Sequence, residues 1–169
     1  MKNLAQIMTI TLFGFIIMGC GSNDTDSLEK LGKTVVSSLQ GQDIETYLSL
    51  CGTSGDEIEY FKSLRYPDSL KEMVEKEIAS LEKECDSRDQ EHRKQRTEEF
   101  YELAKDRFWS NAEIVRIEVD SIRESNIYMP KFCKKITVYF KGHEPLTIRE
   151  AGKFQGGWKI VENHPLRWE

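Results

Sequence analysis

The chain has 169 residues, of which 38% are hydrophobic, 31% charged and 10% aromatic, and its formal net charge is −5. This length suits a single domain. The composition is too aromatic for a disordered chain and too polar for a protein with several membrane spans. Because acidic side chains outnumber basic ones, we expect no binding to nucleic acid or to anionic lipid surfaces.

The first twenty residues have the features of a secretory leader. Lys2 supplies a positive charge, and residues 4–18 are mostly apolar. A run of about 15 residues is shorter than the ~20 that a membrane-spanning helix needs. The leader ends in Ile17-Met18-Gly19-Cys20, which resembles the lipobox of bacterial lipoproteins. An ordinary signal peptide, in which Cys20 has no role, is the alternative.

The lipobox resemblance implies cleavage after Gly19, attachment of diacylglycerol to Cys20 and N-acylation of the new terminus. Several acyl chains would anchor the protein stably, since each buried CH₂ contributes ~0.8 kcal/mol. We therefore expect a lipid-anchored protein of the bacterial cell envelope, at the outer membrane or on a periplasmic face. Residues 1–19 are then the signal peptide, residues 20–27 the lipidated cysteine and a flexible tether, and residues 28–169 a single α+β domain.

Two helices are expected to follow the tether. Apolar residues recur at steps of three and four over residues 28–41, with Ser27 or Asp26 as the N-cap and a glycine as the last residue. Asp43 is placed to cap a shorter helix over residues 44–50. The sequence Gly-Thr-Ser-Gly that comes next predicts a break.

A long helix is expected over residues 70–108. Ser69 and Glu72 have the spacing of a capping box at its start. Residues 82–99 are mostly charged, with pairs such as Glu84–Arg88 and Asp89–Arg93 four apart. Because a continuous helix of this length would be about 58 Å long, it must project or break into a hairpin. The charged stretch is either a solvated helix face or a partner-binding arm.

From Glu113 the pattern alternates as in strands, with Val115, Ile117 and Val119 predicted to share the buried face. Gly156-Gly157 predicts the two-residue turn of a tight hairpin. Four antiparallel strands, or five with residues 125–129, would form a meander that the N-terminal helices cover. The last residues, 165–168, are expected to fold back and cap the sheet.

This element order, with the link Leu39 to Tyr47 and the hairpin Phe154 to Ile160, resembles the NTF2-like and cystatin-like superfamily. It is similar in particular to small uncharacterised lipoproteins of Bacteroidetes that carry such a domain. The resemblance implies an α+β fold in which helices pack on a strongly curved antiparallel sheet of four to five strands and form a cone. The long charged helical segment departs from the compact pattern of the family.

Some members of this superfamily are isomerases or dehydratases that use Asp, His and Tyr inside the cone, whereas many bind ligands or proteins. No residue here matches a catalytic position. Side chains considered for a cavity are Tyr60, Tyr66, Tyr139 and His143, although Tyr139 suits the outer face and His143 a turn. A pocket of several hundred Å³ lined by two or more ionisable groups would favour an enzyme.

We therefore expect a non-enzymatic envelope lipoprotein that binds a small apolar ligand or a partner protein. The alternatives are an NTF2-like isomerase or dehydratase, and a docking subunit that uses the helix over residues 70–108.

The remaining cysteines predict neither a metal site nor a redox motif. Cys51, Cys85 and Cys133 are too far apart for a Cys-x-x-Cys pattern. A disulfide between Cys51 and Cys133, or between Cys51 and Cys85, is open, as is a set of three buried thiols. The histidines are isolated and expected at the surface, and no glycine-rich nucleotide motif occurs. We expect no metal and no cofactor.

Overall fold

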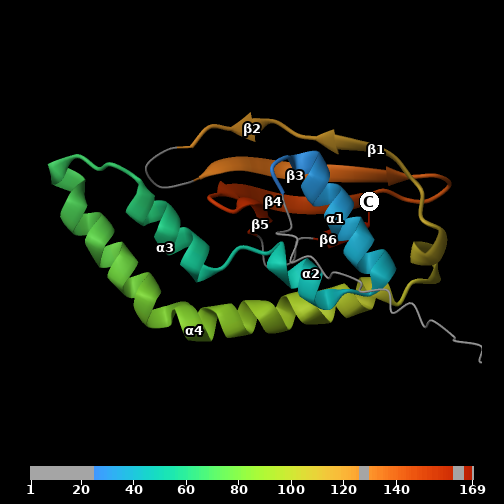
Figure 1. Ribbon diagram of the computed structural model, residues 1–169, viewed down its shortest axis with the longest axis horizontal. Helices are drawn as coiled ribbons and strands as arrows, with labels where there is room; N and C mark the ends of the chain where they lie inside the picture. The colour runs from blue at the N-terminus through green and yellow to red at the C-terminus, as the bar shows by residue number, and fades with distance from the viewer. Residues whose placement is uncertain (1–24, 126–129, 162–165, 169) are drawn as a thin grey trace, which may run out of the picture.

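The structure is a computed structural model that describes residues 25–125, 130–161 and 166–168. Figure 1 shows an α+β arrangement in which helices precede and cover an antiparallel sheet, which confirms the predicted fold class. The lipobox and most of the expected strand over residues 125–129 lie outside the described residues. The helices are α1 (Leu28–Gly41), α2 (Ile44–Ser49), α3 (Ser54–Ser63), α4 (Asp68–Ala104) and the short 3-10 helix η1 (Arg107–Asn111).

Two long central strands carry the sheet, and shorter strands pair along their outer edges. The strands are β1 (Ile114–Val119), β2 (Ile122–Arg123), β3 (Lys131–Phe140), β4 (Leu146–Phe154), β5 (Gly157–Ile160) and β6 (Leu166–Trp168). β3 pairs with β1 and then β2 on one edge, and β4 pairs with β5 and then β6 on the other, all antiparallel. Residues 166–168, expected to cap the sheet, therefore form an edge strand.

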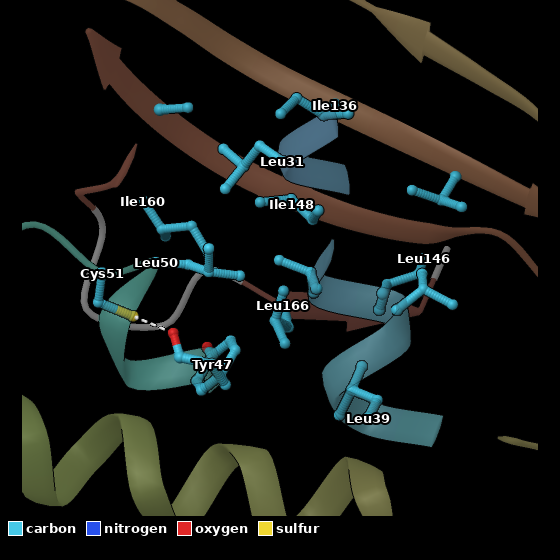
Figure 2. Close-up of a cluster of buried hydrophobic side chains, with 14 of the residues drawn as sticks. Leu31, Leu39, Tyr47, Leu50, Cys51, Ile136, Leu146, Ile148, Ile160 and Leu166 are labelled. Carbon is cyan, nitrogen blue, oxygen red and sulfur yellow. Dashed lines mark hydrogen bonds between the residues drawn. The ribbon is translucent and has the colours of Figure 1, made fainter. Parts of the chain in front are cut away.

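The apolar core lies between α1 and the sheet, as Figure 2 shows for a cluster of buried side chains. Leu31 and Leu39 of α1 and Ile136 and Ile148 of the central strands are fully buried. α1 packs directly on β3, since a Cβ at Gly32 would lie in van der Waals contact with Val138 Cγ2, at 3.4 Å. Burial of these aliphatic side chains, each worth about 1.5–3 kcal/mol, accounts for much of the stability at this end.

The predicted caps of the first two helices are confirmed. Ser27 Oγ accepts a hydrogen bond from Lys30 N at 3.2 Å, and Asp43 Oδ1 accepts one from Thr46 N at 3.0 Å. α1 ends at Gly41, but Gln42 is the residue that takes the left-handed conformation, with φ of 52°.

The capping boxes are not where the sequence predicts them. α4 begins at Asp68, directly after Pro67, whose ψ of 147° is extended, and its N-cap makes no side-chain hydrogen bond. Ser69 is therefore already inside the helix, and the predicted Ser69–Glu72 box is wrong. A box forms instead at Thr53 and Asp56, in the stretch expected to be a break, and it starts α3 at Ser54.

α4 is a single helix of 37 residues, and its ribbon bends near its middle (Figure 1). The second half passes under α2 and the core, where Phe100 is fully buried. The first half extends away from the core with α3 beside it. The long helix thus projects, which was one of the two expectations, and α3 packs beside its projecting half. We call α3 and residues 68–86 of α4 the arm.

The first strand follows its predicted burial only in part. Ile117 is half-buried and packs against the core, as predicted, but Val115 and Val119 are 62% and 36% exposed, and Ile114 packs against the core instead. The cause is a register shift between Ile114 and Arg116 in the pairing with β3. An extra residue at a bulge moves the side chains that follow to the opposite face.

The final hairpin turns one residue earlier than predicted. Phe154 pairs with Gly157, so the turn residues are Gln155 and Gly156. Gly157 has φ of 116°, and a Cβ there would lie 2.4 Å from Thr25 Oγ1. Thr25 is buried, and its carbonyl accepts a hydrogen bond from Trp158 N at 2.8 Å. Thr25 therefore belongs to the fold, although the sequence placed it in the flexible tether.

Candidate functional site

A groove of about 580 Å³ lies between the arm and the end of the sheet that is nearest to it. Its lining has an apolar part and an ionisable part, which come from α3, α4, the central strands and the segments next to them. The apolar part consists of Phe61, Leu81, Pro130, Phe132, Phe154 and Val161. The ionisable part consists of Glu57, Tyr60, Glu77, Arg88, Arg123 and Glu150.

An irregularity in β4 helps to build the floor of the groove. Glu150 has φ of 52°, and the buried side chains Ile148 and Ala151 on either side of it are three positions apart, so simple alternation breaks here. Beyond this point Gly152 pairs with Phe132. The missing side chain at Gly152 leaves room for the Phe154 ring, whose Cε2 would lie 3.0 Å from a Cβ at that position.

The charged side chains at the inner wall of the groove neutralise each other. Arg88 Nη1 lies 3.1 Å from Glu57 Oε2, and Arg88 Nη2 donates to Glu57 Oε1 at 3.3 Å. Such a two-point contact fixes both side chains more firmly than a single hydrogen bond. Burial raises the pKa of Tyr60 above its usual value, with a further contribution from Tyr66, so this phenol is protonated at neutral pH.

The arm is held to the rest of the fold by polar contacts between elements. Ser54 N and Ser54 Oγ both donate to Asp89 Oδ1 at 2.9 Å. Lys159 of β5 donates to both carboxylate oxygens of Asp56, at 2.7 and 2.9 Å. The exposed fractions of these two side chains, 21% and 13%, are the lowest of the ion pairs in the described residues.

The charged stretch over residues 82–99 is therefore not simply solvated, and its predicted pairs within the helix are wrong. Arg88 binds Glu57 of α3, and Arg93 binds Glu45 of α2 at 2.9 Å. Both cations are used across helices rather than along α4. Removing this stretch would therefore remove contacts that hold α2 and α3 to α4.

Arg96 is the most deeply buried charge of this stretch, with 4% of its surface exposed. Its Nη1 donates to Gly52 O at 2.9 Å, and its Nε has no partner. Arg96 lines two further cavities, of about 120 Å³ and about 10 Å³. His92, expected at the surface, is half-buried in the wall of the smaller cavity, and burial together with Arg96 and Arg88 lowers its pKa.

The three described cysteines are free, and the structure argues against the Cys51–Cys133 disulfide. Cys133 pairs with Ala151, Ala151 pairs with Ile160, and Cys51 bridges to Ile160. Three strand spacings, or about 14 Å, thus separate two Cα atoms that a disulfide needs within about 7 Å. Cys51 and Cys133 are buried in the core, where Cys51 Sγ approaches Tyr47 O (Figure 2), and burial raises the pKa of Cys51 to about 11.

Of the four side chains considered for a cavity, Tyr60 alone lines the groove. Tyr66 is half-buried, and its buried hydroxyl makes no hydrogen bond to the described residues. Tyr139 lies outside, as expected, with its hydroxyl on Glu118 Oε2 at 2.8 Å and Arg116 over its ring. His143 is exposed between β3 and β4. The ionisable groups of the groove were missed because they come from separate elements and share no spacing.

In the described part of the chain, no group of three or more His, Cys, Asp and Glu side chains could hold a metal ion. None of the helices described here combines the length and apolar character needed to cross a membrane. Comparison of the chain with models of protein families, with curated proteins and with solved structures gave no match.

Proposed function

We propose that the protein is a bacterial envelope lipoprotein, anchored through a lipid on Cys20, that holds a small and largely apolar ligand in the groove beneath its arm. The anchor rests on Ile17-Met18-Gly19-Cys20 at the end of an apolar leader. The binding role rests on the groove, whose volume of about 580 Å³ is in the range of small-molecule sites.

The apolar part of the lining supports the binding of a small ligand. Aromatic and aliphatic side chains from three elements, Phe61, Leu81 and Phe154, give the ligand an apolar surface. Two of the charged side chains, Glu57 and Arg88, form an ion pair with each other. Apolar side chains combined with fixed polar groups are typical of small-molecule sites.

A neutral apolar fluorophore tests the binding role. N-phenylnaphthylamine gains fluorescence when it leaves water, so titration reports its affinity for the groove. We expect Leu81→Glu to weaken binding at least tenfold, because a carboxylate would enter the apolar lining. Met73→Glu is the matched control, since Met73 is 46% exposed on the same helix and does not line the groove. Equal binding by the two variants would contradict the proposal.

The anchor is tested separately, on the protein extracted from membranes. Mass spectrometry of its N-terminal peptide is expected to show acyl chains on Cys20, and Cys20→Ser is expected to release the protein from the membrane fraction. An unmodified Cys20 in a membrane-free fraction would contradict the anchor and leave the groove titration unaffected.

The enzyme alternative has one observation in its favour. The groove has the volume and the ionisable lining that would favour catalysis, with a protonated phenol at Tyr60 and carboxyl groups at Glu77 and Glu150. A phenol can donate to a carbonyl oxygen while a carboxylate removes a neighbouring proton. Such a reaction would exchange deuterium from heavy water into a carbonyl ligand recovered from the native protein. We expect no exchange if the groove only binds.

A further inference from the structure

Arg96 presents an unusual electrostatic problem for the fold. Its guanidinium stays charged at every physiological pH, and burying a charge is costly unless it is paired. Yet only 4% of Arg96 is exposed, its Nη1 donates to a neutral carbonyl, Gly52 O, and its Nε makes no hydrogen bond to the described residues. No carboxylate of the described residues lies within ion-pair distance of it. This buried cation therefore has capacity for an anion.

The cavity beside Arg96 has a volume of about 120 Å³. It lies between α4 and the segment that joins α2 to α3. The charged side chains that line it are two guanidinium groups, of Arg96 and Arg93, and one carboxylate, of Asp89. The neutral walls are formed by Leu48, Cys51, Gly52 and Thr53.

The charged side chains that line the cavity still have donor or acceptor atoms that make no hydrogen bond to the described residues. Arg93 uses Nη2 on both carboxylate oxygens of Glu45. Asp89 uses Oδ1 on Ser54, and its Oδ2 has no hydrogen bond to any described residue. The cavity thus combines N–H donors from two arginines with a single carboxylate acceptor, all three from α4.

We propose that this cavity binds an oxyanion that still carries a proton at neutral pH, of which inorganic hydrogen phosphate is the simplest. Its unprotonated oxygens would accept from Arg96 and Arg93, and its hydroxyl would donate to Asp89 Oδ2. Sulfate has a similar shape but no proton at neutral pH, so it would meet the Asp89 carboxylate with repulsion. Charge and protonation together would then select phosphate over sulfate.

This site is distinct from the groove. The space between them, bordered by residues of both such as Arg88 and Arg96, holds only about 10 Å³, about one water molecule. An apolar ligand in the groove therefore cannot extend into the phosphate cavity. The two proposals stand or fall separately.

Calorimetric titration of the folded protein with phosphate and with sulfate, at equal ionic strength, tests the site. We expect the wild type to bind phosphate at least tenfold more tightly than sulfate. Asp89→Asn keeps an amide oxygen for Ser54 but removes the charge, so we expect sulfate to bind that variant about as well as phosphate. Arg96→Met should lose phosphate binding. Arg116→Met, an exposed arginine over Tyr139, is the matched control and should bind as the wild type does.

Absence of phosphate binding in the wild type would overturn the proposal, as would equal affinity for both anions. Phosphate binding by Arg96→Met at wild-type strength would also overturn it. If Arg96→Met does not fold, the change in selectivity of Asp89→Asn decides: a gain in sulfate affinity supports the site, and unchanged selectivity contradicts it.

Discussion

The two ends of the molecule are held together in different ways. At one end, α1 and the central strands bury aliphatic side chains completely, and the contacts are apolar. At the other end, the arm is joined to its neighbours through ion pairs and hydrogen bonds such as Asp56–Lys159 and Ser54–Asp89. The apolar end therefore carries most of the stability, while the polar end leaves a groove open for a ligand.

α4 belongs to both ends and shows the contrast within one helix. Phe100 is fully buried and stacks on Tyr47 with ring centroids 5.1 Å apart, whereas Leu81 is half-buried and lines the groove. The helix thus connects the rigid core to the binding region. Substitutions along it measure how unequal the two ends are.

The largest effect is expected from truncation at the core end of α4. Phe100→Ala should lower the free energy of unfolding by about 3–5 kcal/mol, because it leaves a cavity among fully buried side chains. Leu81→Ala should cost about 1 kcal/mol or less, since its side chain already faces the groove. Urea unfolding followed by circular dichroism measures both. Similar losses of unfolding free energy in the two variants would contradict the distinction between the two ends.

The second-largest effect is expected at alkaline pH, which should lower the free energy of unfolding through Cys51 in the apolar core. Burial raises the pKa of Cys51 from 9.0 to about 11, so the folded state favours the protonated thiol. The resulting stabilisation, about 3 kcal/mol, is present below pH 9 and is lost as the pH rises from 9 to 11. The stability difference between the wild type and Cys51→Ala should shrink over this interval. A difference that stays constant with pH would show that Cys51 is not desolvated in the folded state.

Breaking the ion pairs of the arm should have the smallest effects on stability, and the cost should be larger for the more buried pair. Lys159→Met leaves a shielded carboxylate at Asp56 without its cation and should cost about 1–3 kcal/mol. The pair Lys62–Glu82, at 2.7 Å, joins the two helices of the arm in solvent, with more than half of each side chain exposed. Lys62→Met should therefore change stability by less than about 1 kcal/mol. Thermal unfolding measures the loss of stability in both variants. Equal losses would mean that burial does not determine how much these ion pairs contribute.

Sequence patterns predicted the apolar end better than the polar one. Repeated apolar spacing and short-range caps such as Ser27 and Asp43 are local signals, so the early helices and the antiparallel sheet could be recognised. The burial of Val115 was predicted wrongly because a bulge depends on the partner strand. The turn before Gly157 was misplaced by one residue because the approach of Thr25 is a contact from far along the chain.

The groove could not be predicted, for a related physical reason. Charged residues four apart on a helix suggest pairs within that helix, but Arg88 and Arg93 reach acids on other helices. Which acid a long cation meets depends on the packing of α2 and α3, which no local pattern encodes. Residue type alone makes Tyr60 a candidate for a cavity.

Hydrogen exchange measured with and without N-phenylnaphthylamine tests most directly whether the groove beneath the arm is the binding site. We predict that the ligand slows exchange in α3 and in the part of α4 around Leu81, and leaves exchange in α1 unchanged, because the ligand contacts the arm and not the core. Slower exchange confined to α1, or no change anywhere despite binding, would contradict the account.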